Sequence, residues 1–377
     1  MQLTKYKLGD LIVQRREKNK NFDVPIRGVS KEGFIKPKQQ EADTSIYNVF
    51  YRNDFVFNPA RMELNSIALN LEFDKALCSS LYEVFYVKDE SIVLPEYLNL
   101  HIKREEFARY CDYIGLGSAR EYCRFANISG YEIYLPSIDK QQEIVEADRL
   151  IKRRIHLNEQ LIHNLEATAQ ALYRKMFVDN INKENLPAGW RMGTIIDFGE
   201  VITGKTPSSE NPEDFGGKMP FVTPGDFTNY RKFTIGAERW LSDDGINRLK
   251  GKVLPKGSVI VTCIGSDMGK VVIASEECIT NQQMNSIVVK RGEYSDYLYY
   301  VLLSMTMELK AMALGSSTMP LLNKSDFEKI AVIFPSSDLL IEFSQIVTAE
   351  NNLLLLKLKE NSKLTELQSL LLAKMGQ

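Results

Sequence analysis

The sequence predicts an α+β protein built from two strand-rich domains and two long helices, and three observations carry this prediction. The 377 residues are more than one ordinary domain needs. The order of segments in the first half returns in the second half, about 200 residues later. Each copy also ends in an unbroken helical pattern of about 40 residues. A duplicated chain of this kind predicts two similar domains, each closed by a long helix.

The two copies match segment by segment. Each opens on an aromatic residue and a short apolar stretch, followed by a strand that contains a proline. Turn residues then lead into β-branched or aromatic strands, and a helix follows. The matched segments are 6–9 with 190–193, 24–29 with 219–224, 52–57 with 255–260, 95–98 with 295–298, 117–118 with 315–316, and 133–137 with 332–336. Their common order is the main reason to expect a duplicated fold.

A long helix follows the last strand of each copy, and Ser137 and Ser336 are expected to cap the two helices. Apolar residues recur at three- and four-residue steps, which is the spacing of a coiled-coil seam, and Asn158 falls in the first seam. For one helix, such a stripe more often marks ordinary core packing. Two helices that each close a repeat favour packing against each other. The residues expected in the helix pair or in partner contacts are Ile144, Ile151, Ile155, Ile162, Leu165, Leu172, Ile346, Leu353, Leu364, Leu367 and Leu371.

Turn-rich residues 180–189 separate the copies and are expected to form a linker. The predicted organisation is a globular domain over 1–136, a helix over 137–179, the linker, a globular domain over 190–335 and a helix over 336–377.

Composition limits the class of protein. Hydrophobic residues make up 44% and charged residues 25%, as in a soluble globular protein. No long apolar run or signal-like start is evident, so we expect a cytoplasmic chain that does not span a membrane. Five dispersed cysteines predict reduced thiols rather than a disulfide framework or a zinc site, and the three histidines predict no metal centre; His156 and His163 are expected to be structural.

Several segments resemble the specificity subunits of Type I restriction–modification systems. Residues 186–190, 195–198 and 203–208 are similar to the family's entry into its second recognition domain. Residues 58–61 and 133–142 are also similar to common family stretches. The likeness covers nearly the whole chain in the right order, and the duplicated order is its most specific part.

The resemblance implies a pseudo-twofold arrangement of two target-recognition domains on an antiparallel coiled coil. It further implies that each domain reads one half of a bipartite site on double-stranded DNA, within a bacterial defence system. Methyltransferase and restriction–translocase subunits would be the partners. S-adenosylmethionine, ATP and Mg²⁺ would bind to those partners, so this chain would be non-catalytic and carry no cofactor, while directing adenine methylation or restriction. A 40-residue helix is about 60 Å long, enough to space two half-sites about 34 Å apart.

Base readout needs Arg, Lys, Asn or Gln side chains on exposed loops, and phosphate contacts need basic or hydroxyl side chains. Any one such residue is more often plain solvated surface. The formal net charge of −2 is low for a DNA-binding protein, so either the cations gather on one face or binding needs a partner. The candidate DNA contacts are Lys36, Lys38, Arg61, Arg120, Arg124, Lys205, Thr206, Arg231, Lys232, Ser266, Lys270, Gln282, Gln283 and Ser316.

Two alternatives compete with DNA recognition. Residues 199–206 match the phosphate-loop pattern G-x-x-x-x-G-K-[ST], which would indicate a nucleotide hydrolase. However, Pro207 follows at once, and Val201 and Ile202 resist the backbone angles of such a loop. The second alternative is a scaffold whose paired helices gather proteins without DNA, and the charge balance favours it. No Asn-Pro-Pro-aromatic motif or glycine-rich cofactor loop indicates a methyltransferase.

Overall fold

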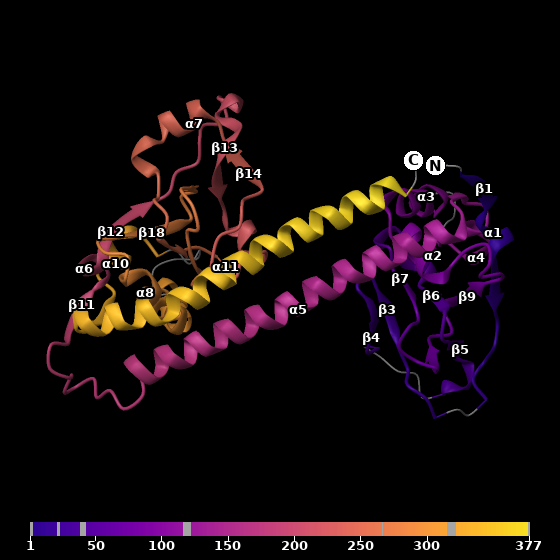
Figure 1. The fold of residues 1–377 in the computed structure, drawn as a ribbon, viewed down its shortest axis with the longest axis horizontal. Coiled ribbons are helices and arrows are strands. Elements are labelled where there is room, and N and C mark those ends of the chain that lie inside the picture. Colours follow the sequence, from indigo (N-terminus) through magenta and orange to yellow (C-terminus); the bar gives the residue numbers. More distant parts are fainter. Residues whose placement is uncertain are drawn as a thin grey trace. The chain divides into compact units, whose positions relative to one another are not determined.

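The fold is known from a computed structural model, which describes residues 3–20, 23–37, 43–115, 122–265, 267–314 and 322–375. The chain divides into two compact units. Unit 1 comprises Met1–Ile155 and Leu364–Gln377, and unit 2 comprises His156–Lys363. Each unit holds one strand-rich module and a part of both long helices (Figure 1). The predicted α+β class with two long helices is therefore confirmed.

Unit 1 is organised around a four-stranded antiparallel sheet in the order β2-β9-β6-β7. Smaller pairs, β1 with β10, β3 with β4 and β5 with β8, surround it. The elements of its module are β1 (Thr4–Lys7), α1 (Leu8–Leu11), β2 (Ile12–Arg15), β3 (Gly28–Ser30), β4 (Gly33–Ile35), η1 (Thr44–Ile46), β5 (Asn48–Tyr51), β6 (Asp54–Phe57), η2 (Pro59–Leu64), β7 (Ile67–Leu69), β8 (Lys75–Cys78), β9 (Glu83–Val87), α2 (Pro95–Ile102), α3 (Glu105–Gly115), α4 (Phe125–Ile128) and β10 (Glu132–Leu135).

Unit 2 repeats this plan with a four-stranded sheet in the order β12-β18-β15-β16 and a smaller sheet β14-β13-β17. Its module contains β11 (Arg191–Thr194), α6 (Ile195–Phe198), β12 (Gly199–Thr203), η3 (Pro212–Asp214), β13 (Phe215–Val222), η4 (Pro224–Thr228), β14 (Arg239–Leu241), α7 (Asp243–Arg248), η5 (Lys250–Lys252), β15 (Val259–Thr262), β16 (Val271–Ile273), β17 (Ile279–Thr280), β18 (Met284–Val289), α8 (Tyr294–Ser304), α9 (Thr306–Leu314), α10 (Lys324–Glu328) and β19 (Ala331–Phe334).

The duplication inferred from sequence is visible in strand pairing. In each unit the first strand pairs antiparallel with the last one, β1 with β10 and β11 with β19. The four-stranded sheets have equivalent orders, with β2, β9, β6 and β7 matching β12, β18, β15 and β16. The exact residue matches differ at the start of each copy. Because β1 and β11 pair with equivalent strands, Tyr6 corresponds to Gly193 and not to Trp190.

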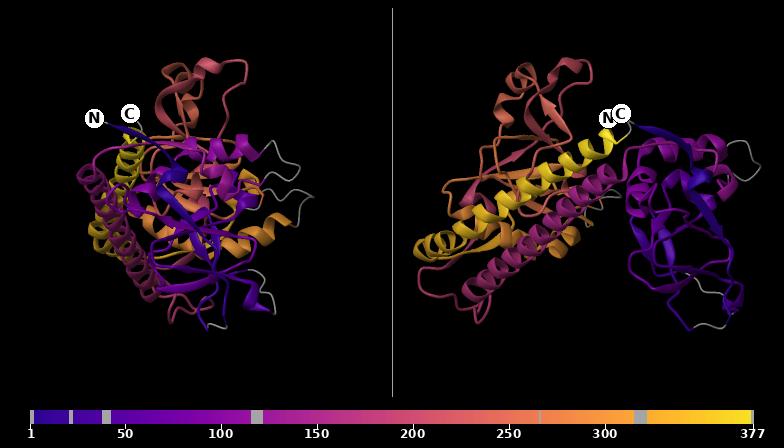
Figure 2. Two further views of the ribbon diagram at one scale, coloured as in Figure 1. Left: turned by 90° about the vertical axis from the view of Figure 1, so that its right-hand side faces the viewer. Right: turned by 45° about the vertical axis from the view of Figure 1, so that its right-hand side comes forward.

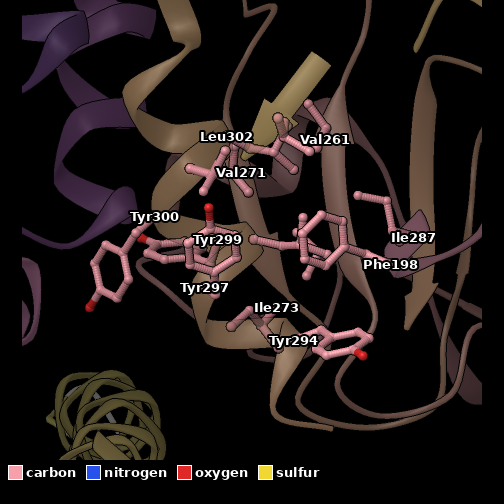
Figure 3. Packing of buried hydrophobic residues seen from close by; sticks show 14 of the residues in the cluster. Phe198, Val261, Val271, Ile273, Ile287, Tyr294, Tyr297, Tyr299, Tyr300 and Leu302 are labelled. Carbon is pink, nitrogen blue, oxygen red and sulfur yellow. The ribbon is translucent and has the colours of Figure 1, made fainter. Parts of the chain in front are cut away.

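The main core of unit 2 lies between its four-stranded sheet, α8 and the long helices. Buried β-branched residues of β15 and β16 face a group of tyrosines on α8, and burial of these apolar and aromatic side chains provides the main driving force for packing. Tyr297 also donates a hydrogen bond from its hydroxyl to the Ile333 carbonyl, 2.6 Å away, which satisfies its buried polar atom. Figure 3 shows the side chains of this cluster gathered together.

Two long helices complete the chain, α5 (Ile138–Phe177) and α11 (Ser337–Lys374). In unit 1 the start of α5 meets the end of α11, and Gln368 donates a hydrogen bond to Asp148 at 2.7 Å. In unit 2 the remainder of α5 meets the start of α11, and Ile162 belongs to the same buried cluster as Leu354. The helices therefore run antiparallel within each unit (Figures 1 and 2).

The seam on α5 agrees with the sequence pattern, since Ile144, Ile151 and Ile162 are buried, and Leu165 and Leu172 pack against the core of unit 2. Ile155 is partly buried. On α11, Leu364 and Leu371 are partly buried. Of the two roles predicted for Ile346, Leu353 and Leu367, packing in the helix pair does not hold, because these residues are exposed; partner contact stays a prediction. The seam of α11 instead follows a seven-residue step through Leu340, Val347, Leu354, Asn361, Gln368 and Met375.

By length and composition alone, α11 would also qualify as a membrane-spanning helix, because one 18-residue window has a hydropathy of 1.2. Its Leu340, Phe343, Val347 and Leu354 are buried in the core of unit 2. The apolar character of α11 is thus used, at these four positions, for packing within the protein.

Candidate nucleic-acid interface

The candidate site of unit 2 lies where four strand ends meet. β12 ends at Thr203 and β15 ends at Thr262, while β18 and β16 begin on the same side of the sheet. The pairing of Thr203 with Asn285, and of Thr262 with Met284, places these ends together. We call the described residues of loops 204–209, 263–270 and 280–283 the unit 2 edge. Loops held at the end of a rigid sheet are a common place for binding residues.

Backbone contacts fix the loops of the unit 2 edge against one another. The Lys205 N–H donates to the Thr280 carbonyl at 2.9 Å, and the Cys263 N–H donates to the Gln283 carbonyl at 2.8 Å. Only glycine fits at position 204, because the backbone of Asn281 approaches closely: a Cβ atom on residue 204 would lie 2.2 Å from the Asn281 carbonyl oxygen. These contacts give the edge a defined geometry before any ligand binds.

The side chains of this edge are those that base and phosphate recognition needs. Lys205 and Gln282 are exposed, and Thr206 donates a hydrogen bond from its hydroxyl to the Gln282 side-chain oxygen at 2.6 Å. Gln283 accepts a hydrogen bond at its side-chain oxygen from the Asn281 amide at 3.2 Å. Lys270 forms an ion pair with Asp267 at 2.7 Å. The structure thus brings together five predicted contacts: Lys205, Thr206, Lys270, Gln282 and Gln283.

Unit 1 has an equivalent edge, formed by residues 16–17, 58–61, 83 and 122–124. Each edge contains an equivalent backbone hydrogen bond. In unit 1 the Cys123 N–H donates to the Pro59 carbonyl at 2.9 Å, and in unit 2 the Leu322 N–H donates to the Cys263 carbonyl at 3.0 Å. Pro59 and Cys263 follow the equivalent strands β6 and β15. This contact brings the predicted residues Arg61 and Arg124 to one edge.

Glu83 orders the unit 1 edge. Its carboxylate accepts a hydrogen bond from the Phe125 N–H at 2.7 Å and lies 3.6 Å from the Arg124 guanidinium. The Arg124 side chain remains 64% exposed, so it stays accessible to a ligand, and Arg61 is exposed as well. A carboxylate that orients an arginine without burying it leaves the cation available for phosphate or guanine.

Sequence reasoning missed two basic residues near this edge. Arg16 is exposed directly after β2, in a place equivalent to the Gly204-Lys205 turn after β12. Lys103 donates hydrogen bonds to the carbonyls of Ile67, at 2.6 Å, and Lys31, at 3.1 Å. Burial lowers the pKa of Lys103 to about 8, since desolvation penalises its charged form. Aligning the two repeats by strand ends would have identified Arg16, whereas nothing in the sequence indicates the contacts of Lys103.

The other predicted contacts lie elsewhere. Lys36 is exposed after β4, on the β3–β4 hairpin. Arg231 is 54% exposed and lies 4.0 Å from Glu166 of α5, while it lines a hollow together with Lys270. The predictions that fall outside the described residues are Lys38, Arg120, Ser266 and Ser316.

Lys232 requires a correction. Its side chain is 1% exposed, and its ammonium forms an ion pair with Asp296 at 2.6 Å. A cation that is buried and neutralised inside unit 2 is not accessible to a DNA phosphate. The sequence prediction of a DNA contact here is wrong, because the turn that carries Arg231 on the surface directs the next residue inward.

The fold also shows that residues 199–206, which match the phosphate-loop pattern in sequence, do not form a phosphate loop. Residues Gly199–Thr203 form strand β12 and pair in five consecutive positions with β18. A phosphate loop instead curves from a strand into the start of a helix, so that backbone N–H groups surround the anion. The pattern in residues 199–206 is therefore a chance match. Among the described residues no group of three or more His, Cys, Asp and Glu side chains is arranged to hold a metal ion.

Comparisons with known proteins agree with this architecture. The specificity subunit of the HindI Type I restriction enzyme from Haemophilus influenzae is 28% identical, over 76% of this chain and 77% of that protein. The specificity subunit of the MjaIX enzyme from Methanocaldococcus jannaschii is 32% identical, over 48% of this chain and 42% of that protein. The solved S subunit of the Type I restriction–modification system from M. genitalium has the same fold, with a TM-score of 0.66 at 14% identity; the match covers 100% of this chain and 96% of that chain.

Residues 4–167 and 187–339 each match the family described as the Type I restriction modification DNA specificity domain. These two matches cover most of the chain and coincide with the two repeats of strand order. The chain belongs to the Type I restriction–modification DNA specificity family and carries two copies of its domain.

Proposed function

We propose that each unit of this specificity subunit reads one half of a bipartite site on double-stranded DNA, through its unit 1 or unit 2 edge. The observation that carries this proposal is the repetition of the edge. Each unit places basic and amide side chains at one end of its own four-stranded sheet, and the two ends are equivalent in strand order. Arg124 and Lys205 supply accessible cations, and Gln282 supplies an amide suited to adenine.

The long helices have a separate role in this proposal. They set the gap between the half-sites, and methyltransferase subunits bind them. Supporting this, both helices carry several large, exposed apolar side chains on the side away from the seam, and groups of exposed apolar residues mark interaction sites. These residues are Leu150, Leu157, Ile346, Leu353, Leu356, Leu367 and Leu370. Restriction–translocase subunits complete the assembly, and the partner subunits hold S-adenosylmethionine, ATP and Mg²⁺.

The low net charge also fits a chain that binds DNA together with a methyltransferase subunit. With a formal charge of −2, this chain supplies little non-specific attraction for DNA, so we expect tight binding only in complex with the methyltransferase. On this proposal the specificity subunit contributes recognition, and its partner contributes the methyl-transfer chemistry on adenine.

Co-expression of the chain with the methyltransferase of its own system, followed by genome-wide mapping of methylated adenines, tests this function. We expect a bipartite motif with a fixed gap. Exchange of residues 190–335 for those of a relative should change one half of the motif only. Insertion of one helical turn in both α5 and α11 should change the gap and leave both halves intact. A complex that assembles but neither methylates DNA nor shifts it would instead indicate a protein scaffold.

A further inference from the structure

Lys232 lies at the centre of a buried polar network in unit 2. Its ammonium contacts the Asp296 carboxylate at 2.6 Å and donates a hydrogen bond to the Asn351 side-chain oxygen at 2.8 Å. The Asn351 amide in turn donates to Asp296 at 2.8 Å, which closes a three-membered ring of contacts. Asp296 belongs to α8 and Asn351 to α11. We call these three residues the Lys232 network.

The two charged side chains of the network are largely shielded from water. The Lys232 side chain is 1% exposed and that of Asp296 is 11% exposed, and the ammonium lies 4.7 Å from the centre of the Tyr300 ring. Burial lowers the pKa of Lys232, and the adjacent Asp296 opposes that effect. Directional contacts between charged groups are strong in such a low-dielectric site, and loss of either partner leaves an uncompensated charge.

Two backbone hydrogen bonds and the short strand β16 join the network to the unit 2 edge. The Ile273 N–H donates to the Lys232 carbonyl at 2.8 Å, and the Thr234 N–H donates to the Ile273 carbonyl at 3.0 Å. Ile273 ends β16, and β16 begins at Val271, directly after Lys270 of the edge. The position of β16 relative to α8 and α11 is thus tied to Lys232.

Two hollows lie next to this network. One, of about 290 Å³, is lined by Arg231, Lys270, Tyr299 and Tyr300, and the other, of about 360 Å³, is lined by Phe233, Ile273, Asp296 and Asn351. Close packing between the module and the helices is interrupted at both places. Beside the apolar core that joins the module to the long helices, the polar contacts of the Lys232 network therefore add a directional link at this place.

Unit 1 provides a natural comparison. When segments 95–98 and 295–298 are matched, Glu96 of α2 occupies the place of Asp296 of α8, and it pairs with Arg149 of α5 at 2.6 Å. The Arg149 side chain is 58% exposed, and Glu96 is 25% exposed. In unit 1 the cation comes from the long helix and is solvated, whereas in unit 2 it comes from the module and is buried. Exposed pairs contribute little orientation or stability.

We propose that Lys232, Asp296 and Asn351 are positioning residues for the second half-site: they fix the unit 2 edge relative to α8 and α11 without touching DNA. This inference rests on the proposed function. Base readout requires hydrogen-bond donors and acceptors to be held in a narrow range of positions, and a ring of directional contacts restricts orientation more than an apolar contact of equal volume. Discrimination in the second half-site should therefore depend on residues that lie far from the bases.

The test compares K232M, the double variant K232M/D296L and N351A, each in the full chain complexed with its methyltransferase. R149M, which removes the exposed pair of unit 1, is the matched control. Once the wild-type motif is known, methylation rates are measured on duplexes with single mismatches in either half. The thermal unfolding midpoint of each complex is measured alongside.

We expect K232M to lower the unfolding midpoint, because Asp296 is left buried and unpaired, and K232M/D296L to restore it, because both charges are removed. Discrimination against second-half mismatches should nevertheless fall about tenfold in the double variant, roughly the contribution of one base contact. N351A keeps the ion pair, so it should fold and show a smaller loss in the same half. First-half discrimination should stay unchanged in these three variants, and R149M should alter neither half.

If K232M/D296L and N351A both fold and discriminate in the second half like the wild type, the network only stabilises unit 2 and the inference is overturned. Equal losses in both halves would overturn it as well, because they would indicate general damage to the complex. Should K232M/D296L fail to assemble, N351A alone decides between these outcomes. A wild-type complex that yields no bipartite motif would refute the proposed function itself.

Discussion

The side-chain amide of Asn158 donates a hydrogen bond to the side-chain oxygen of Asn361 at 2.8 Å, inside the antiparallel pair of α5 and α11. Asn158 is 3% exposed, and the neighbouring seam positions Ile162 and Leu354 are apolar. A paired asparagine in an apolar seam satisfies its hydrogen bonds in one register only, so it specifies alignment at a cost in stability. This pair fixes how the helices align in unit 2.

We expect the double variant Asn158→Leu/Asn361→Leu to be more resistant to urea by about 1 kcal/mol, because an apolar pair avoids burying amide groups. It should also allow α5 and α11 to pair in more than one alignment. Spin labels at Gln160 and Lys359 should show one narrow distance in the wild type and a broader distribution in the variant. Asn158→Leu alone should destabilise, since Asn361 loses this hydrogen bond. A double variant with an unchanged, narrow distribution would show that the apolar seam already fixes the register.

Alanine substitution of two adjacent leucines of α11 should lower the free energy of unfolding by very different amounts. Leu354 is 2% exposed in the core of unit 2, and the preceding residue, Leu353, is 37% exposed. Leu354→Ala should lower the free energy of unfolding by about 2–5 kcal/mol, because it leaves a cavity. Leu353→Ala should change it by less than about 1 kcal/mol. Denaturant unfolding of both variants measures the two changes in unfolding free energy. Equal losses of free energy would contradict the assignment of Leu354, and not Leu353, to the buried seam.

Lys205 and Lys256 offer a matched pair on one sheet. Both are exposed, but Lys205 follows the end of β12 at the unit 2 edge, whereas Lys256 precedes the opposite end of β15. Lys205→Ala should weaken DNA binding by the methyltransferase complex and reduce the slope of log K against log salt by about 1, as expected for one lost phosphate contact. Lys256→Ala should leave both quantities unchanged. The opposite ranking of the two variants would place the interface at the other end of the sheet.

Stability should depend on pH through His101. Burial in α2 lowers the pKa of this imidazole to about 4, from 6.5. The unfolded chain therefore takes up a proton near pH 6.5 that the folded chain does not bind until about pH 4. Stability falls as the pH falls through this window, by about 3 kcal/mol at its lower end.

His101→Leu cannot bind this proton, so the variant should lose correspondingly less stability than the wild type between pH 6.5 and 4. Urea unfolding at several pH values in that range measures both slopes, and normalising each protein to its own value at pH 7 removes the packing effect of the substitution. Parallel curves would show that His101 is protonated in the folded protein.

The exposed apolar residues of α11 should serve assembly rather than folding. Leu356 is 59% exposed, so Leu356→Lys should change the unfolding midpoint of the isolated chain little. If methyltransferase subunits bind this surface, the variant should reduce complex formation at least tenfold, because a buried apolar contact becomes an unpaired charge. Size-exclusion chromatography with the methyltransferase reports the loss. Lys359→Glu, at another exposed position of α11, tests whether a charge change by itself has the same effect.

Several features were determined by the sequence alone, because they are local or repetitive. The repeat of segments predicted two copies of one fold, and the regular spacing of apolar residues identified the seam of α5, where Ile144 and Ile151 are buried. The seam of α11 was less readable. Leu353, Leu354, Leu355 and Leu356 cover all sides of the helix, so periodicity cannot show which of them faces the core.

The tertiary structure decided what depends on distant partners. Antiparallel pairing brings Lys205, Lys270 and Gln282 to one edge, although 77 residues of sequence separate the first from the last (282 − 205). Arg231 and Lys232 look alike in sequence, yet Asp296 and Asn351 hold only the second one inside the protein. Charge and turn propensity are properties of a segment, whereas the burial of a charge depends on whether a distant element supplies its counter-charge.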